Sequence, residues 1–318
     1  MTAQTGGGVG VGGAPPPASM TAAAPPQDLT AATAIQRTPK SIAAQVGYLA
    51  ALFLATFMFV FPFIWLLSAS LKTRTNVFSN ELFPMPLHPE NYMRIFEIVP
   101  LLSWFYNSTL VSVLAAGTVT ISSAVVAFGF AYFRFPGRNL LFGLVLASMM
   151  LPGAVMMIPN FLIWNALGQV NSPTFAPLWA GNLFASAFYV FMLRQFFMGL
   201  PRETFEAARV DGASYPRMFW SIAVPLTRAA LIVVFIFELK AAWTDLMRPL
   251  IFLRDLALFT LPQGLQYLVK IYNPQVGGQG EFHLVMAASV LITIPMIVIF
   301  FLAQRYFIEG IATTGSKG

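Results

Sequence analysis

Polar and ionisable side chains interrupt an otherwise apolar stretch between residues 225 and 253. They are Glu238, Lys240, Trp243, Thr244, Asp245 and Arg248. Charged groups inside a membrane-length helix are costly and usually face a bundle interior or an aqueous cavity. A tryptophan face can stack on the C–H face of a sugar, while carboxylates and hydroxyls bind its hydroxyl groups. These residue types favour a path for a polar solute, lined by Glu238, Trp243, Thr244 and Asp245.

The spacing of the two acids leaves two interpretations open. In a continuous helix, Glu238 lies roughly 20 Å past Pro225, near mid-membrane, at about 1.5 Å per residue. Asp245 then follows on nearly the same face, and Arg248 lies one turn further, where it can pair with Asp245. The alternative to a solute path is that Asp245 and Arg248 form a structural pair, with Trp243 as an anchor at the membrane interface.

Prolines predict a bend in another apolar stretch, which reads Leu151-Pro152-Gly153 and then Ile158-Pro159-Asn160. Proline inside a helix frees backbone carbonyl groups and kinks the helix. A membrane bundle tolerates this only where neighbours or water satisfy the freed groups. We expect the bend to line the solute path, with Asn160 and Trp164 facing it; an ordinary packing kink is the alternative.

A short polar segment at about residues 201–223 lies between two long apolar stretches. Its charged residues are Arg202, Glu203, Glu206, Arg209, Asp211 and Arg217. So many charges exclude a membrane span, and the segment is too compact for a separate domain. We predict a helix-turn-helix, called the elbow below, that offers a docking surface to another protein.

Composition sets the class of protein. Of 318 residues, 57% are hydrophobic and only 9% are charged, and the mean hydropathy is +0.72, far outside the soluble range. The absence of cysteine excludes a disulfide framework and a thiolate metal site. The net charge of +6 could suggest nucleic acid, but the basic residues are scattered at helix ends and are better interpreted as topology signals.

A spanning helix needs about 20 apolar residues, and six stretches qualify or nearly do. They run from Val46 to Leu67, Leu110 to Tyr132, Leu140 to Leu167, Phe175 to Leu193, Pro225 to Leu253, and Leu284 to Phe307. Unpaired backbone is not tolerated in lipid, so the prediction is an all-α, polytopic membrane protein with six transmembrane helices. The connections at residues 70–101 and 254–282 are predicted to be outside loops.

The distribution of lysine and arginine predicts the orientation. With the N-terminus inside, the cytoplasmic side holds Arg37, Lys40, Arg134, Arg138, Arg194, Arg202, Arg209, Arg217, Arg228, Arg305 and Lys317. The outside then holds Lys72, Arg74, Arg94, Arg254 and Lys270. Cytoplasmic loops carry the excess of basic residues, so both termini and the elbow are predicted to be cytoplasmic.

The elbow resembles the EAA loop in the membrane subunits of bacterial ATP-binding-cassette importers. The family pattern is Glu-Ala-Ala, three residues, Gly, nine residues, Ile, one residue, then Leu-Pro. This chain has Glu206-Ala207-Ala208, Gly212, Ile222 and Val224-Pro225, so every spacing fits and only Leu is replaced, by Val.

Further segments extend the resemblance over about residues 40–318. Trp243-Thr244-Asp245 is similar to the family's Trp-Asn-Asp or Trp-Asn-Glu, with Thr244 in place of Asn. Leu261-Pro262-Gln263-Gly264-Leu265 resembles the family's Leu-Pro-x-Gly-Leu, and the C-terminal residues from Gln304 resemble those of maltose- and glycerol-phosphate-type permeases. The chain is most similar to the second membrane subunit of carbohydrate importers, which implies a MetI-like permease fold in a bacterial plasma (inner) membrane.

The resemblance also implies partners: a second homologous permease, two ATPase subunits and an extracytoplasmic binding protein that delivers the substrate. It implies alternating access, driven by an ATPase docked on Glu206, Ala207, Ala208, Asp211 and Gly212. The three small residues are expected to let the elbow seat closely. Glu206 is placed to pair with a basic ATPase residue, and Asp211 with Arg209, or else Asp211 caps the second short helix.

No enzyme site is visible in the sequence. It has no Gly-x-x-x-x-Gly-Lys-Ser/Thr phosphate loop, so ATP and Mg²⁺ are expected on the partner ATPase and no cofactor on this chain. His88 and His283 lack ligand-spaced partners, so neither a metal site nor a catalytic residue is predicted.

The predicted organisation has three parts. Residues 1–40, rich in Gly, Ala and Pro, form a disordered cytoplasmic tail; residues 41–306 form the six-helix permease domain; and residues 307–318 form a cytoplasmic C-terminal tail. By resemblance to the maltose system, Thr313 to Gly318 would reach between the ATPase subunits.

Two alternatives to sugar import remain. A glycerol-phosphate-like anion would need cationic cavity residues such as Lys240 or Arg248. A secondary transporter could use Glu238 and Asp245 for proton coupling, but it would not need the elbow.

Overall fold

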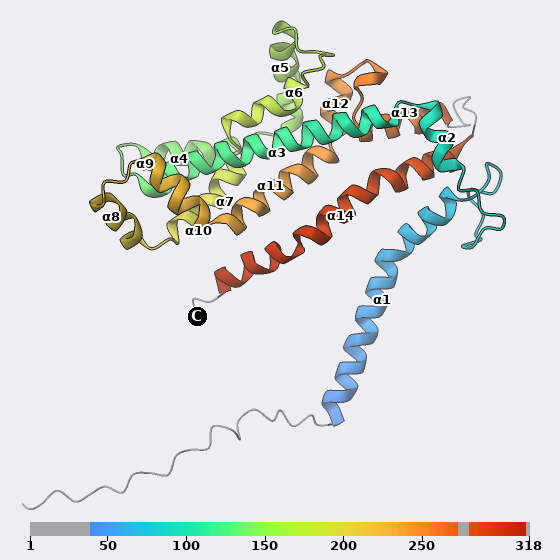
Figure 1. The fold of residues 1–318 in the computed structure, drawn as a ribbon, viewed down its shortest axis with the longest axis horizontal. Helices are drawn as coiled ribbons and strands as arrows, with labels where there is room; N and C mark the ends of the chain where they lie inside the picture. Colours follow the sequence, from blue (N-terminus) through green and yellow to red (C-terminus); the bar gives the residue numbers. More distant parts are fainter. Residues whose placement is uncertain (1–38, 273–279, 316–318) are drawn as a thin grey trace, which may run out of the picture. The chain divides into compact units, whose positions relative to one another are not determined.

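The computed structural model describes residues 39–272 and 280–315, and the secondary structure in these ranges is helical, without β-strands (Figure 1). The chain divides into two units, residues 1–57 and residues 58–318. The expected N-terminal tail lies almost wholly outside the described residues. The architecture below is that of the second unit.

Short connections separate most of the helices along the described part of the chain. In chain order they are α1 (Pro39–Ser70), α2 (Asn91–Ile98), α3 (Leu101–Tyr132), α4 (Arg138–Ser148), α5 (Gly153–Ala166), α6 (Ala176–Trp179), η1 (Ala180–Phe184), α7 (Ala187–Met198), α8 (Arg202–Val210), α9 (Tyr215–Met218), η2 (Phe219–Ala223), α10 (Val224–Leu226), α11 (Arg228–Trp243), α12 (Met247–Phe252), η3 (Leu256–Leu258), α13 (Leu261–Tyr272) and α14 (Phe282–Gly315).

Helix α3 is the centre of the second unit. It packs against α7 and α11, and α11 packs in turn against α14. Many of its buried side chains are small: Ser112, Ala115, Ala116, Ser123, Ala124 and Ala127. Without a hydrophobic drive between helices in lipid, small residues favour association because they let backbones approach closely.

Four described helices are long and apolar enough to cross a membrane. They are Ile42–Ser70, Leu101–Tyr132, Ala176–Met198 and Phe282–Gln304. Two bent pairs bring the number to six if each pair is one span: α4 with α5 at 95°, and Tyr215–Leu226 with α11 at 81°. The six predicted stretches therefore correspond to four spans and two broken ones.

The bend between α4 and α5 confirms the expected effect of one proline. The helix ends before Leu151-Pro152, and Pro152 is extended (φ −62°, ψ 127°) as the residue that precedes α5. Pro159 lies inside α5 and does not end it. The second broken span changes direction at Thr227, whose backbone N–H and Oγ1 both donate to the carbonyl of Ala223, at 3.1 and 2.7 Å.

The connections predicted to be loops contain helices, so that prediction is wrong in part. Helix α2 lies within residues 70–101, and α13 lies within residues 254–282. Pro262 stands in the first turn of α13, where a missing N–H costs nothing. Leu261 and Leu268 of α13 are fully buried in a cluster with Trp104 of α3 and Leu284 of α14.

Gly264 explains why α13 can lie so close to α3. A Cβ atom on Gly264 would come within 2.2 Å of Cε3 of Trp104. The Trp104 side chain is fully buried, and its Nε1 donates to the carbonyl of Leu256 at 2.8 Å. The Leu-Pro-x-Gly-Leu segment is thus a packing motif at the start of a helix.

The segment before α2 is fixed by its own polar contacts. Asn91 is buried, and its Nδ2 donates to the carbonyls of Ser70 and Lys72 at 2.9 and 3.0 Å. Nδ1 of His88 lies 2.6 Å from Oε1 of Glu90, and this hydrogen bond holds the pKa of the exposed Glu90 carboxyl below its usual range.

Candidate functional site

The elbow is a helix-turn-helix, as predicted. Its first helix, α8, has Glu203 in its first turn and Arg209 in its last, which complements the positive and negative ends of the helix dipole. The second helix, α9, continues through the single π-helical turn η2 into α10.

The turn of the elbow is a Schellman motif, which accounts for the Glu-Ala-Ala-x-x-x-Gly spacing. Gly212 has φ +77°, a left-handed conformation that glycine adopts without a steric penalty. Its N–H donates to the carbonyl of Arg209 at 3.0 Å, and the N–H of Ala213 donates to that of Ala208 at 2.9 Å. These two bonds satisfy carbonyls that a helix end leaves unpaired.

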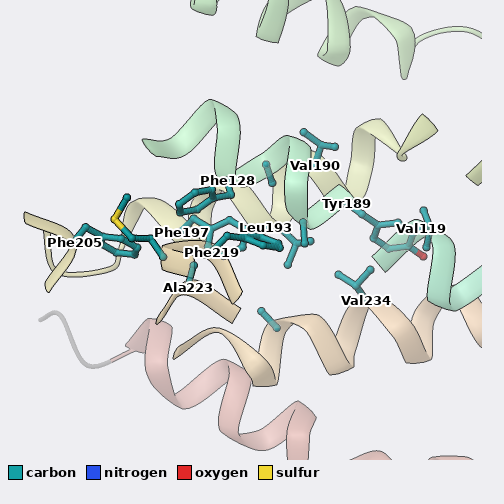
Figure 2. Close-up of a cluster of buried hydrophobic side chains, with 14 residues drawn as sticks. Val119, Phe128, Tyr189, Val190, Leu193, Phe197, Phe205, Phe219, Ala223 and Val234 are labelled. Atoms are coloured by element: carbon teal, nitrogen blue, oxygen red, sulfur yellow. The ribbon is translucent and has the colours of Figure 1, made fainter. Parts of the chain in front are cut away.

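An aromatic cluster attaches the elbow to the membrane helices (Figure 2). The cluster consists of Phe128 of α3, Phe197 of α7, Phe205 of α8 and Phe219 of η2. From the Phe128 centroid, those of Phe219, Phe197 and Phe205 lie 5.4, 5.7 and 6.1 Å away. All four side chains are buried, in a cluster that continues to Val234 of α11. The elbow is therefore part of the same hydrophobic core as α3, α7 and α11.

The other face of the elbow is open to a partner. Glu206, Ala207, Asp211 and Gly212 are exposed, while Ala208 is half-buried against the core. The expected contacts of Asp211 are absent within the described residues: no ion pair joins it to Arg209, and Ser214, not Asp211, precedes α9, without a side-chain cap bond. Asp211 instead ends α8, where its N–H donates to the carbonyl of Ala207.

Comparison with known proteins identifies the family. The sequence model described as "Binding-protein-dependent transport system inner membrane component" matches residues 123–313, a range that includes the elbow. This chain belongs to that family. It is a multi-pass permease, and its relatives are membrane subunits of ABC importers.

Individual relatives agree with this assignment. The permease is 33% identical, over 82% of its length and 92% of the relative's, to the arabinooligosaccharides transport system permease protein AraQ of Halalkalibacterium halodurans. It is 34% identical, over 65% of its length and 71% of the relative's, to the sn-glycerol-3-phosphate transport system permease protein UgpE of Yersinia enterocolitica. Its fold is similar to a chain of a bacterial ABC transporter involved in alginate import, with a TM-score of 0.72 at 21% identity, over 85% of this chain and 98% of that one.

The permease does not carry Glu238 and Asp245 on one continuous helix, so the expectation that they share a face is wrong. Helix α11 ends at Trp243. Pro249 explains the break, since a helix continued through it would lose a hydrogen bond and bring the proline ring against the carbonyl of Asp245. Oδ1 of Asp245 accepts instead from the backbone N–H of Arg248 at the start of α12.

The predicted pair of Asp245 and Arg248 is present. Nε of Arg248 donates to Oδ2 of Asp245, and its Nη1 donates to the carbonyl of Leu178 at 3.2 Å. The Asp245 side chain is 18% exposed and that of Arg248 38%. Thr244 is exposed, and its Oγ1 donates to the carbonyl of Lys240 at 3.0 Å.

Trp243 is buried among its neighbours and exposes almost no surface of its own. Its side chain is 5% exposed and packs in the cluster with Trp104 and Leu261, with the ring of Phe105 at 6.4 Å. Its Nε1 is buried without a hydrogen-bond partner among the described residues.

Glu238 belongs to a third neighbourhood. Its Oε1 accepts from Nδ2 of Asn182 at 2.8 Å, and the same amide donates to the carbonyl of Ala115 at 3.2 Å. Asn182 thus joins α11, η1 and α3. Asn182 was not among the residues predicted from the sequence, although an amide between apolar helices is a signal of internal hydrogen bonding.

Asn160 and Trp164 lie on α5, where Asn160 is exposed and Trp164 is half-buried. Trp164 packs against a buried cluster that contains Leu178 and Phe252. The predicted path residues are therefore distributed over separate neighbourhoods, with exposed polar groups from α5 and from the segment after α11.

Proposed function

We propose that this chain is one of two membrane subunits of an ATP-driven importer for a sugar or oligosaccharide. The elbow supports this proposal most strongly. It combines the fixed turn at Gly212, buried aromatic side chains that pack on the membrane helices, and an exposed face on which a partner can dock. In this proposal ATP is hydrolysed on separate ATPase subunits, and a binding protein outside the membrane delivers the substrate.

The elbow would couple the ATPase to the transport path as follows. An ATPase that binds the exposed face around Glu206, Ala207 and Gly212 more tightly in one of its states biases the permease toward one conformation. Phe205 and Phe219 on the opposite face carry that bias into the core shared with α3, α7 and α11. This mechanism requires the elbow, and with it both termini, to be cytoplasmic, in agreement with the excess of basic residues on that side.

We propose that the exposed polar groups line the substrate path: Asn160, Thr244, the accessible edges of Trp164, Glu238 and Asp245. Trp243 does not line this surface directly, since its ring is covered by neighbours. In this proposal it packs beneath the polar groups and holds them in place. A carbohydrate fits hydroxyl, amide and carboxylate partners better than a phosphate does. Of the two cations that an anionic substrate could use, Arg248 is already paired with Asp245, which leaves only Lys240 for a phosphate.

A substitution series at Gly212 tests the coupling role. Left-handed backbone costs a non-glycine residue roughly 1–2 kcal/mol, but Asn tolerates it well. We expect Gly212→Asn to keep the turn and Gly212→Val, with a β-branched side chain, to disrupt it. Apart from its two chain neighbours, no described residue lies within 4 Å of a Cβ at Gly212, so we attribute any crowding there to a partner.

The assay is recovery of an ATPase and a second permease with the tagged chain from mild detergent, followed by binding-protein-stimulated ATP hydrolysis in vesicles. We expect Gly212→Asn to resemble the wild type and Gly212→Val to lose stimulation while still inserting. If both variants lose the ATPase, the residue acts through its small size at the docked surface. A wild type that purifies alone and transports without ATP would refute the proposed function and favour the secondary transporter.

A further inference from the structure

A basic cavity of about 510 Å³ lies between the elbow and the carboxyl ends of α3 and α7. Its charged lining consists of Arg134, Arg138, Arg194, Arg202, Arg209 and Glu206. Five guanidinium groups thus face a space that they share with a single carboxylate. The coupling mechanism gives a role to Glu206 but none to these arginines.

Two of the arginines are half-buried and lack a counter-charge. Within the described ranges, no carboxylate lies within 4.0 Å of any of the five arginines. Arg194 stacks over the ring of Phe142, with Cζ 4.2 Å from the centroid, and its buried Nε has no hydrogen-bond partner among the described atoms. Among the described residues, Arg138 donates to the carbonyl of Phe133, at 3.2 Å. Like charges gathered in a partly buried space are stabilised by a bound anion.

A groove of about 390 Å³ adjoins the basic cavity and shares Phe133 and Arg134 with it. It is lined along α3 by Val126, Gly129 and Phe130, which with Phe133 follow the spacing of one helix face. Apart from the backbone of its own helix, no described atom lies within 4 Å of a Cβ on Gly129, so the glycine leaves room in this groove. The groove is apolar apart from Arg134 and leads from the end of a membrane span back along that span.

The basic cavity and the apolar groove beside it match the charged head and the apolar tail of an amphiphile. Candidate spans end at Tyr132 and Met198, both in the cavity lining, so the arginines lie at the membrane–water boundary. Basic pockets between helices at this depth suit phospholipid head groups. We propose that the cavity and groove bind an anionic phospholipid, with its phosphate at Arg138 and Arg194 and an acyl chain along Gly129 of α3.

The test measures lipid binding to the full chain, with the subunits that accompany it, after delipidation in dodecylmaltoside. Short-chain phosphatidylglycerol is titrated against the thermal midpoint, because a ligand that binds the folded state raises it. Arg138→Gln, Arg194→Gln and Gly129→Leu are compared with Arg217→Gln, which removes an exposed arginine of the elbow outside the cavity lining. Elution profiles verify that each variant is folded.

We expect each cavity arginine variant to weaken phosphatidylglycerol binding about tenfold, which corresponds to about 1.4 kcal/mol. Gly129→Leu, which changes no charge, is expected to weaken it by filling the groove, and Arg217→Gln to leave it unchanged. Phosphatidylcholine of the same chain length serves as the uncharged control.

Three results would overturn the proposal. If inorganic phosphate binds as tightly as the lipid and Gly129→Leu leaves lipid binding unchanged, the cavity is a free-phosphate site. Equal effects of Arg217→Gln and the cavity variants would indicate general surface charge. Binding that is lost whenever the ATPase is attached would assign the cavity to a protein partner.

Discussion

Gly264→Ala adds one methyl group at the tightest helix contact described above. The new Cβ would lie 2.2, 2.4 and 2.6 Å from Cε3, Cζ3 and Cδ2 of Trp104. Carbon atoms pack favourably at about 3.5–4.0 Å, so the indole ring or α13 must move by more than an ångström. The ring has little room, because Trp104 is fully buried and is held by its bond to the carbonyl of Leu256.

The expected cost follows from these contacts. Overpacking of a well-packed core costs about 1–3 kcal/mol, and loss of the indole hydrogen bond adds about 1 kcal/mol. We expect Gly264→Ala to lower the free energy of unfolding by about 2–4 kcal/mol. At about 2 °C per kcal/mol for a chain of this size, the thermal midpoint falls by roughly 4–8 °C.

The assay is the thermal midpoint of the purified chain in one detergent, with Gly117→Ala as the matched control. Gly117 lies inside α3, and apart from the backbone of its own helix no described atom lies within 4 Å of its added Cβ. There, alanine should stabilise the helix by about 0.5–1 kcal/mol, because glycine loses more backbone entropy on folding. Replacing glycine by alanine should thus lower the thermal midpoint at Gly264 and raise it at Gly117.

A double-mutant cycle shows whether Trp104 causes the cost. In a Trp104→Leu background the clash is gone, so Gly264→Ala should have a much smaller effect than in the wild type. An equal loss in both backgrounds, or no loss in the wild type, would refute the reasoning.

Substitutions at two other positions test polar contacts. Asp245→Asn should reduce transport while ATPase recovery in the pull-down is unchanged, and full transport would leave Asp245 a structural partner of Arg248 only. Asn171 has φ +57°, and its Oδ1 accepts from the N–H groups of Arg254 and Asp255 at 2.8 and 2.9 Å. Asn171→Gly should lower the free energy of unfolding by about 1–3 kcal/mol for two lost hydrogen bonds, and Asn171→Ala by roughly 1–2 kcal/mol more; the reverse order in thermal midpoints would contradict this account.

The elbow could be predicted from the sequence because its shape depends on a few neighbouring residues. A glycine at the end of a polar helix fixes the turn at Gly212, and charges exclude the segment from the membrane. The anchoring by Phe205 and Phe219 could not be predicted in the same way. Their partner, Phe128, lies on another helix far away in the sequence, and only the packing of α3 against α7 brings the rings together.

Two of the predictions that proved wrong have local causes. Pro249 was a signal that α11 cannot continue through Asp245, but the apolar run beyond it suggested one long span. Residues 254–282 were expected to be a loop between two membrane spans. The regular spacing of Leu261, Leu265, Leu268 and Tyr272 favours a helix there, and Pro262 fits its first turn.

The aromatic cluster has a mechanical consequence. Phe205 in the elbow and Val234 in α11 lie in one closely packed core. A force on the elbow therefore moves α11 with it, because no gap between the side chains can absorb the displacement. To slide the elbow independently, the chain would have to expose Phe205 or Phe219, at about 1.5–3 kcal/mol for each side chain. Stiffness therefore comes from aromatic packing, and a displacement applied at Glu206 reaches the middle of the bundle as movement of whole helices.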